Sequence, residues 1–187
     1  MYLKTFKYSI YTILLWIIPF WLRIAMGPVP AFCQNIGTNT NSTIDKVMQA
    51  CAANNSFEVF VLIFLNNIKC CLINILSGVL FGIGTLFCTF INGFMVADMF
   101  VYCHQTMSVE EMLVTTLPHS FELLGFWLSG GVGFIIAWRF KRFVFNEEQI
   151  DKVFIKKICL LTGVASLLTL GAAFVESYIS VNMLNNL

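Results

Sequence analysis

Several polar and ionisable residues lie within or beside long apolar runs, and these residues could carry chemistry. They are Asn66, Asn67, Asn74, Asn92, Asp98, His119, Glu122 and Glu176. An ionisable group that enters a bilayer with such a run costs roughly 2.5 kcal/mol or more, so it normally faces a bundle interior and has a partner there. The sequence therefore predicts an intramembrane polar core made of Asn66, Asn67, Asn92, His119 and Glu122.

His119 and Glu122 are three residues apart, which places them on one face of a helix. Pro118 precedes them directly and suits a first helical turn, so we expect a helix break here, with Glu122 favoured by the helix dipole. The pair could bind a metal, although two ligands do not complete a site and His104 is the only other histidine. It could instead form a proton relay or polar substrate site, as broken helices do in transporters. A third reading is structural: the pair hydrogen-bonds with neighbouring asparagines and holds the broken helix in place.

No catalytic constellation stands out in the chain. A Gly-x-Ser-x-Gly elbow, a His-Glu-x-x-His pair, a phosphate loop and a Cys-x-x-Cys pair are all missing from the sequence. Ser120, Ser129 or Cys103 could be combined with a histidine, but no spacing favours such a site. We therefore expect a protein that is not an enzyme, with no catalytic residues, no cofactor and no metal.

The composition indicates the environment in which these residues work. Of 187 residues, 58% are hydrophobic and 11% are charged, and the mean hydropathy is +0.82. Soluble domains carry about 25% charged residues, so a soluble domain is excluded, and nineteen Phe exclude a disordered chain. The net charge of +1 gives no reason to expect a nucleic-acid partner. The remaining class is an all-α, polytopic transmembrane bundle in which residues 1–187 form one domain.

Five membrane helices, one of them short or broken, account for the apolar runs. They are expected at about 8–26, 57–70, 75–99, 112–138 and 158–175. Two alternatives stay open at this point. The helix over 57–70 could re-enter the membrane instead of crossing it, and residues 1–31 could be a cleaved signal peptide instead of a retained helix.

Basic residues predict the orientation by the positive-inside rule. The residues assigned to the cytoplasmic side are Lys4, Lys7, Arg139, Lys141, Arg142, Lys152, Lys156 and Lys157. The amino terminus is then inside and the carboxyl terminus outside, which requires residues 57–99 to cross twice. Residues 27–56 become an external polar loop, in which Cys33 and Cys51 could form a disulfide if the compartment is oxidising.

Small residues recur along single faces of two helices. The predicted packing positions are Gly78, Gly82, Gly93, Gly125, Ser129 and Gly133. Lipid gives helices no hydrophobic reason to associate, so close approach through small residues is how they pack. These faces could meet within one chain, or they could serve self-association or a partner.

Four blocks in a fixed order resemble the stage II sporulation protein M family of integral membrane proteins. The blocks are Phe64-Leu65-Asn66-Asn67-Ile68, Gly78-x-x-x-Gly82-x-Gly84-Thr85, Ile91-Asn92-Gly93 and Pro118-His119-x-x-Glu122-Leu123. The resemblance covers a family-like core at about 57–140. Ser120 and Ala97 stand where relatives usually have glycine, and both replacements are small.

The resemblance implies a membrane scaffold or an accessory subunit of a membrane complex in the plasma (inner) membrane of a bacterial cell. The expected partners are the lipid bilayer and other membrane proteins, either of an envelope complex or of an ABC exporter associated with bacteriocins, with a homo-oligomer also open. It implies no catalytic residues. The alternative is a small transporter or channel component, whose broken helix near His119 and Glu122 would line a polar path.

Overall fold

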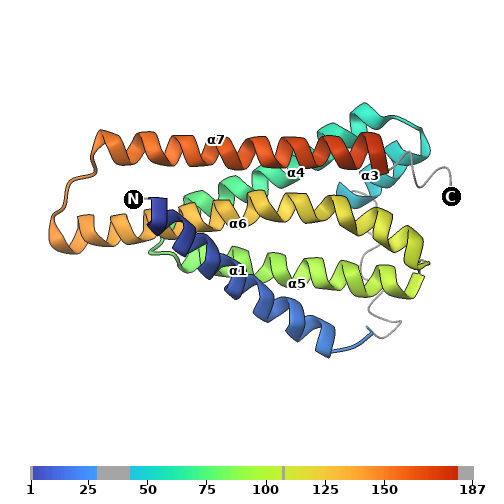
Figure 1. Cartoon of the computed structure of the whole chain (residues 1–187), viewed down its shortest axis with the longest axis horizontal. Coiled ribbons are helices and arrows are strands. Elements are labelled where there is room, and N and C mark those ends of the chain that lie inside the picture. Colours follow the sequence, from blue (N-terminus) through green and yellow to red (C-terminus); the bar gives the residue numbers. More distant parts are fainter. Residues whose placement is uncertain (1, 29–42, 107, 181–187) are drawn as a thin grey trace.

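The computed structural model describes residues 2–28, 43–106 and 108–180, and within these ranges the chain is helical and has no strand. The helices are α1 (Tyr2–Ala25), α3 (Thr43–Ala52), α4 (Ser56–Leu76), α5 (Ile83–Thr106), α6 (Val109–Asn146) and α7 (Lys152–Val175) (Figure 1). Two short elements extend them: the 3-10 turn η2 (Ser77–Val79) after α4, and the π-helical turn η3 (Glu176–Ser180) after α7.

Five helices of the described chain are long and apolar enough to cross a membrane. These segments are Phe6–Ala25, Ser56–Val79, Ile83–Gln105, Ser120–Asn146 and Lys152–Ile179. The prediction of an all-α membrane bundle with five spans is therefore confirmed. The physical basis is simple, because each run reaches the roughly 20 residues that a bilayer core requires.

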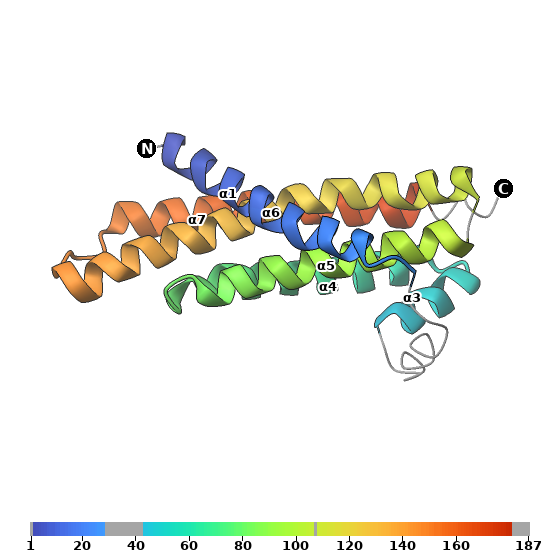
Figure 2. The same cartoon turned by 90° about the horizontal axis from the view of Figure 1, so that it is seen from below.

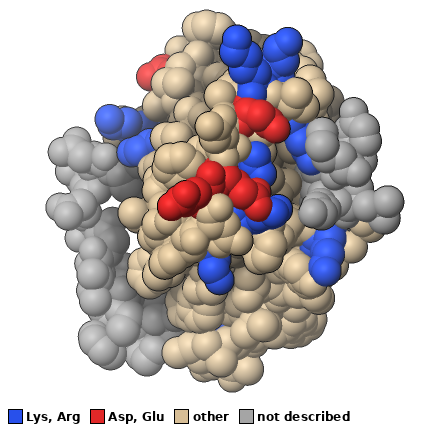
Figure 3. All heavy atoms as spheres, turned by 90° about the vertical axis from the view of Figure 1, so that its left-hand side faces the viewer, with Lys and Arg blue, Asp and Glu red and all other residues tan. Residues whose placement is uncertain are grey.

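The long helices alternate in direction, so the chain crosses the length of the bundle five times (Figures 1 and 2). The start of α1, the turn between α4 and α5, and the connection between α6 and α7 lie at one end. We call this the basic end, because it carries Lys7, Lys141, Arg142, Lys152, Lys156 and Lys157. Figure 3 views it directly and shows Lys and Arg side chains around a smaller acidic group. Helix α3 and the end of α7 lie at the opposite end, which we call the far end.

Helix α4 is longer than expected and ends later. The sequence predicted a short helix over 57–70 and the next helix from about 75, whereas α4 runs for 21 residues to Leu76 and the turn follows at 77–82. Asn74 fits inside the helix because its side-chain amide contacts a neighbouring helix. The turn uses left-handed backbone at Phe81 (φ 52°) and Gly82 (φ 82°). A 21-residue helix is long enough to cross a bilayer, so its length supports crossing over re-entry.

Helix α6 is continuous through Pro118, and the predicted break at His119 is wrong. The helix runs for 38 residues from Val109 to Asn146, and it bends near its amino-terminal end (Figure 1). A proline inside a helix removes one N–H, but ending the helix there would leave several backbone groups without intrahelical partners just before the span that begins at Ser120. Continuing the helix is therefore the less costly solution, and Glu122 lies in a helix interior, well past the first turn.

Helix α6 is the central element of the bundle. It contacts α1, α4, α5 and α7. Half of its most apolar 18-residue stretch (50%) is buried, compared with 22–28% in the other four spans. The remaining helices surround α6 and leave their outer faces apolar and exposed, as a lipid-facing bundle requires.

Glycines allow the closest approaches between α6 and its neighbours. A Cβ atom built on Gly78 would lie 2.2 Å from the carbonyl oxygen of Gly133, and one built on Gly133 would lie 2.5 Å from Oγ1 of Thr85. Similarly, a Cβ on Gly130 would lie 2.4 Å from Cγ2 of Thr12. At Gly78 the two backbones pack directly on one another, and at Gly130 and Gly133 a threonine side chain packs directly on the backbone of α6. Such close approach through small residues is the usual way for membrane helices to associate.

The other small-residue positions also lie at helix contacts. A Cβ on Gly93 would lie 2.5 Å from the carbonyl oxygen of Trp16, and one on Gly125 would lie 2.9 Å from Cγ2 of Thr169. A Cβ on Gly82 would lie 3.1 Å from the Cβ of Ala137, which is also a tight contact. The small residues thus mediate contacts within one chain, between α1 and α5, between α6 and α7, and between α6 and the α4–α5 turn.

Candidate functional site

Asn67 and Glu122 form a direct contact between α4 and α6. The Nδ2 of Asn67 donates a hydrogen bond to Oε1 of Glu122, and the contact is partly buried. Asn67 lies near the middle of its span, and Glu122 near the start of its own. Asn66 points outward and is exposed, with its Nδ2 3.5 Å from Oδ1 of Asn67. The two adjacent asparagines of the motif are therefore not equivalent, since only the second contacts another helix.

Asn92 lies at a different contact, between α5 and α1. Its Oδ1 accepts a hydrogen bond of 2.9 Å from Nε1 of Trp16, whose side chain is buried. The next residue, Gly93, brings the backbone of α5 against that of α1 at the same tryptophan. Three residues of the predicted polar core therefore occupy two separate helix contacts: Asn67 and Glu122 lie at one, and Asn92 lies at the other. His119 lies in α6, and its side chain is outside the described part of the structure.

Asn74 is a further buried polar residue, which the polar core predicted from the sequence did not include. Its side chain is fully buried on α4, and in either orientation of the amide it contacts Oγ of Ser129 on α6, at 3.3 Å. Its backbone carbonyl accepts a hydrogen bond of 2.9 Å from Oγ1 of Thr85. Asn74 lies four residues before Gly78, on the same helix face as the small residues. This spacing was the sequence signal that could have indicated its burial.

A partly buried ion pair joins α1 and α5 towards the far end. Nε of Arg23 lies 2.7 Å from Oδ1 of Asp98, and a second guanidinium nitrogen donates to the carbonyl of Gly27 at 2.9 Å. The Arg23 side chain is 3% exposed, whereas that of Asp98 is 48% exposed. The guanidinium is therefore enclosed by the bundle, whereas the carboxylate lies at its outer face. The pairing was not predicted, because Arg23 and Asp98 are 75 residues apart and no pattern along the sequence links them.

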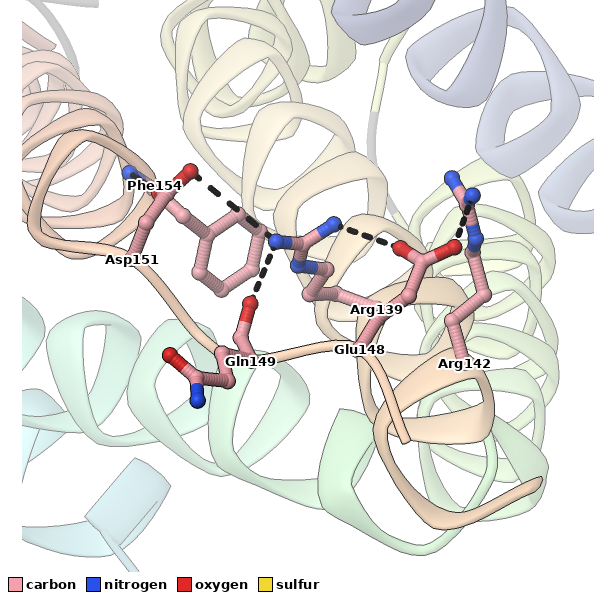
Figure 4. Close-up of polar contacts among 6 residues, drawn as sticks. All are labelled: Arg139, Arg142, Glu148, Gln149, Asp151 and Phe154. Atoms are coloured by element: carbon pink, nitrogen blue, oxygen red, sulfur yellow. Dashed lines mark hydrogen bonds and ion pairs between the residues drawn. The ribbon is translucent and has the colours of Figure 1, made fainter. Parts of the chain in front are cut away.

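A second charged cluster closes the α6–α7 connection at the basic end (Figure 4). Glu148 pairs with Arg139 at 3.0 Å through one carboxylate oxygen and with Arg142 through the other. Arg139 also donates to the carbonyl of Gln149 at 2.6 Å. Asp151 caps α7 by accepting a 2.6 Å hydrogen bond from the N–H of Phe154. These contacts join the end of α6 to the start of α7.

The cysteines and acids of the described chain show no cluster suited to a metal. No group of three or more His, Cys, Asp or Glu side chains converges in the parts that were searched. Cys51 ends α3 at the far end, and burial together with the nearby charge of Glu176 raises the pKa of its thiol. Cys33 lies outside the described residues, so the predicted disulfide with Cys51 stays a prediction.

Taken together, the polar groups of the bundle hydrogen-bond across helix contacts. The pairs are Asn67 with Glu122, Trp16 with Asn92, Asn74 with Ser129, and Arg23 with Asp98. Each pair joins two helices and specifies how far one lies along the other, because a shift of one turn would leave a polar group unsatisfied in an apolar surrounding. This arrangement holds helices in register.

The comparisons with known proteins place the chain. No curated protein and no solved structure matches it. The family model described as Stage II sporulation protein M matches residues 7–181. The match extends beyond the core at 57–140 to include the first and last spans, which the motifs alone had not connected with the family. The chain forms a multi-pass membrane bundle that carries the family's motif residues at its helix contacts, and it belongs to the stage II sporulation protein M family.

Proposed function

We propose that the protein is a non-enzymatic scaffold or accessory subunit of a complex in the plasma (inner) membrane of the cell. The observation that carries this proposal is the use of the intramembrane polar groups. Asn67, Glu122 and Asn92, which belong to the family-like motifs, hydrogen-bond across helix contacts. Groups engaged in this way stabilise a fixed bundle, and a fixed bundle suits a protein that positions others.

The basic end faces the cytoplasm in this proposal. The distribution of Lys and Arg supports this orientation, since cytoplasmic connections carry an excess of both. The far end, with α3, then faces the outside of the cell. Partners would be other membrane proteins, either of an envelope complex or of an ABC exporter, and they would contact the exposed apolar helix faces or one of the two ends. A second copy of the chain is a further candidate.

Substitution of the motif residues tests the role of the polar contacts. Glu122→Gln replaces the carboxyl group that accepts from the Asn67 amide with a carboxamide, and His119→Ala shortens the other motif side chain on α6. We expect both variants to lower the amount of folded protein or of assembled complex. Glu110→Gln makes the same replacement at an exposed position near the start of α6 and serves as the control.

The readout is affinity purification from native membranes in mild detergent, with the yield of monodisperse protein measured in parallel. A reproducible membrane-protein partner, lost or reduced in Glu122→Gln but retained in Glu110→Gln, is the expected result. Purified protein that forms no stable complex and moves a solute by itself in liposomes would contradict the proposal.

A further inference from the structure

An apolar groove lies between α1 and α6 near the basic end. Its volume is about 500 Å³, within the roughly 300–1,000 Å³ range of small-molecule sites. Tyr11 and Leu14 of α1, Phe134 and Trp138 of α6, and Phe81 of the α4–α5 turn line it. The α1 and α6 residues of this lining belong to membrane-spanning segments, so the groove opens towards lipid. An apolar chain is the natural occupant of such a groove.

Two lysines add positive charge to this groove. Lys141 is part of its lining, and Nζ of Lys7 lies 5.6 Å from the ring centroid of Tyr11, which also lines it. Both lysines are exposed, and no carboxylate of the described residues forms an ion pair with either one. By contrast, Glu148 pairs with the two arginines of the same end. The charge of the lysines is therefore available to a ligand.

We propose that this groove binds an anionic phospholipid, with an acyl chain along the apolar lining and the headgroup phosphate at Lys7 and Lys141. Tyrosine and tryptophan side chains favour the headgroup level of a bilayer, and Tyr8, Tyr11 and Trp138 all line the groove. The lining thus combines an apolar surface, interfacial aromatic residues and unpaired positive charge. These features favour a phospholipid over a peptide helix as the occupant. An apolar peptide helix would pack its own side chains into the groove and would not need two cations there.

Lipid titration of the full chain, followed by native mass spectrometry, tests the proposal. The protein in detergent is titrated with phosphatidylglycerol or phosphatidylcholine of identical acyl chains. A lysine near an anionic headgroup is expected to favour binding about fivefold. The double substitution Lys7→Gln and Lys141→Gln should therefore weaken phosphatidylglycerol binding by more than tenfold and leave phosphatidylcholine binding unchanged.

The matched control removes the same charge from the same end. Lys152→Gln together with Lys156→Gln alters two exposed lysines of α7 that do not line the groove, and this variant should keep the preference for phosphatidylglycerol. Equal affinities for the two lipids in the wild-type protein would overturn the proposal. An equal loss in both double variants would also overturn it, because the attraction would then be a general property of the basic end. So would a bound species with the mass of a second copy in place of a lipid.

Tryptophan fluorescence in liposomes supplies a second, independent measurement. Brominated phosphatidylglycerol should quench the fluorescence more than brominated phosphatidylcholine at equal mole fraction. Trp138→Phe should remove this difference, whereas Trp21→Phe, at an exposed α1 position outside the groove lining, should keep it. A difference that persists in Trp138→Phe would place the lipid elsewhere and overturn the assignment of the groove.

Discussion

At the scale of single residues, the packing of the bundle depends on glycines, because a residue without a Cβ atom lets another element approach closely. Gly78 and Gly133 bring the α4–α5 turn against the backbone of α6, with space for hydrogen but not for a methyl group. Gly163, in contrast, lies on α7 with no atom of another element within 4 Å of its Cβ position. The structure therefore has room for an alanine at Gly163 but not at Gly78.

Gly78→Ala should destabilise the fold by about 1–3 kcal/mol, because the new methyl group would lie 2.2 Å from the Gly133 carbonyl oxygen and force a backbone shift. Gly163→Ala should be neutral or stabilising by up to about 1 kcal/mol, since alanine is the better helix former. Equilibrium unfolding in mixed micelles measures both. Equal effects of the two substitutions would contradict the packing at Gly78.

Cys51 gives a prediction about pH. Burial, and secondarily the charge of Glu176, raise the pKa of its thiol above 9.0. The reactive thiolate is then a minor species at neutral pH. As long as the pH stays below the pKa, each rise of one pH unit increases the amount of thiolate about tenfold. In reduced protein, maleimide labelling of Cys51 should keep accelerating beyond pH 9, and Glu176→Gln should accelerate it modestly at a fixed pH below the thiol pKa. Peptide mass spectrometry measures the rates; a plateau below pH 9 would contradict the pKa shift.

At the scale of elements, the α6–α7 connection is held by a carboxylate that two arginines share. Glu148 receives Arg139 and Arg142, while Asp151 caps the following helix. The same segment contains Glu147, whose backbone is left-handed (φ 56°) and whose side chain is exposed. Adjacent acids therefore play different parts: Glu148 holds the connection to the end of α6, and Asp151 at the start of α7 also pairs with Arg139 at 3.9 Å.

Glu148→Gln should loosen this connection without unfolding the bundle. Partly exposed ion pairs contribute up to about 1 kcal/mol, so local opening should increase about fivefold. Limited trypsin digestion of vesicles with the basic end accessible should then cleave near residues 139–152 several-fold faster. Glu147→Gln is the control and should digest as the wild-type protein does. High salt should weaken the contact in wild-type protein and narrow the difference.

At the scale of the whole molecule, α6 contacts the four other spans, and the basic side chains gather at one end. The two ends differ in charge, and an odd number of crossings places the start of α1 and the end of α7 at opposite ends of the bundle (Figures 1 and 2). In the orientation that we propose from the positive-inside rule, the amino terminus is internal.

A topology reporter tests that orientation. A reporter fused after Leu187 should be active outside the cytoplasm, and one inserted in the α4–α5 turn at residues 79–82 should be active inside it. Activity of the carboxyl-terminal fusion in the cytoplasm would contradict the proposed orientation. The expected result has a direct physical reason, because reversing the bundle would move the lysines and arginines of the basic end across the membrane.

The sequence by itself determined the membrane class, the number of spans and the family, because bilayer thickness and charge placement act on local composition. It also identified Asn67, Asn92 and Glu122 as polar exceptions. Only the tertiary structure decided their partners: Asn67 meets Glu122, whereas Asn92 meets Trp16. It likewise decided that α6 continues through Pro118. The partner of a polar residue depends on which helix faces meet, and the continuity of a helix depends on the cost of unsatisfied backbone groups in lipid. The periodicity of residues along one helix contains neither the pairing of helix faces nor this cost.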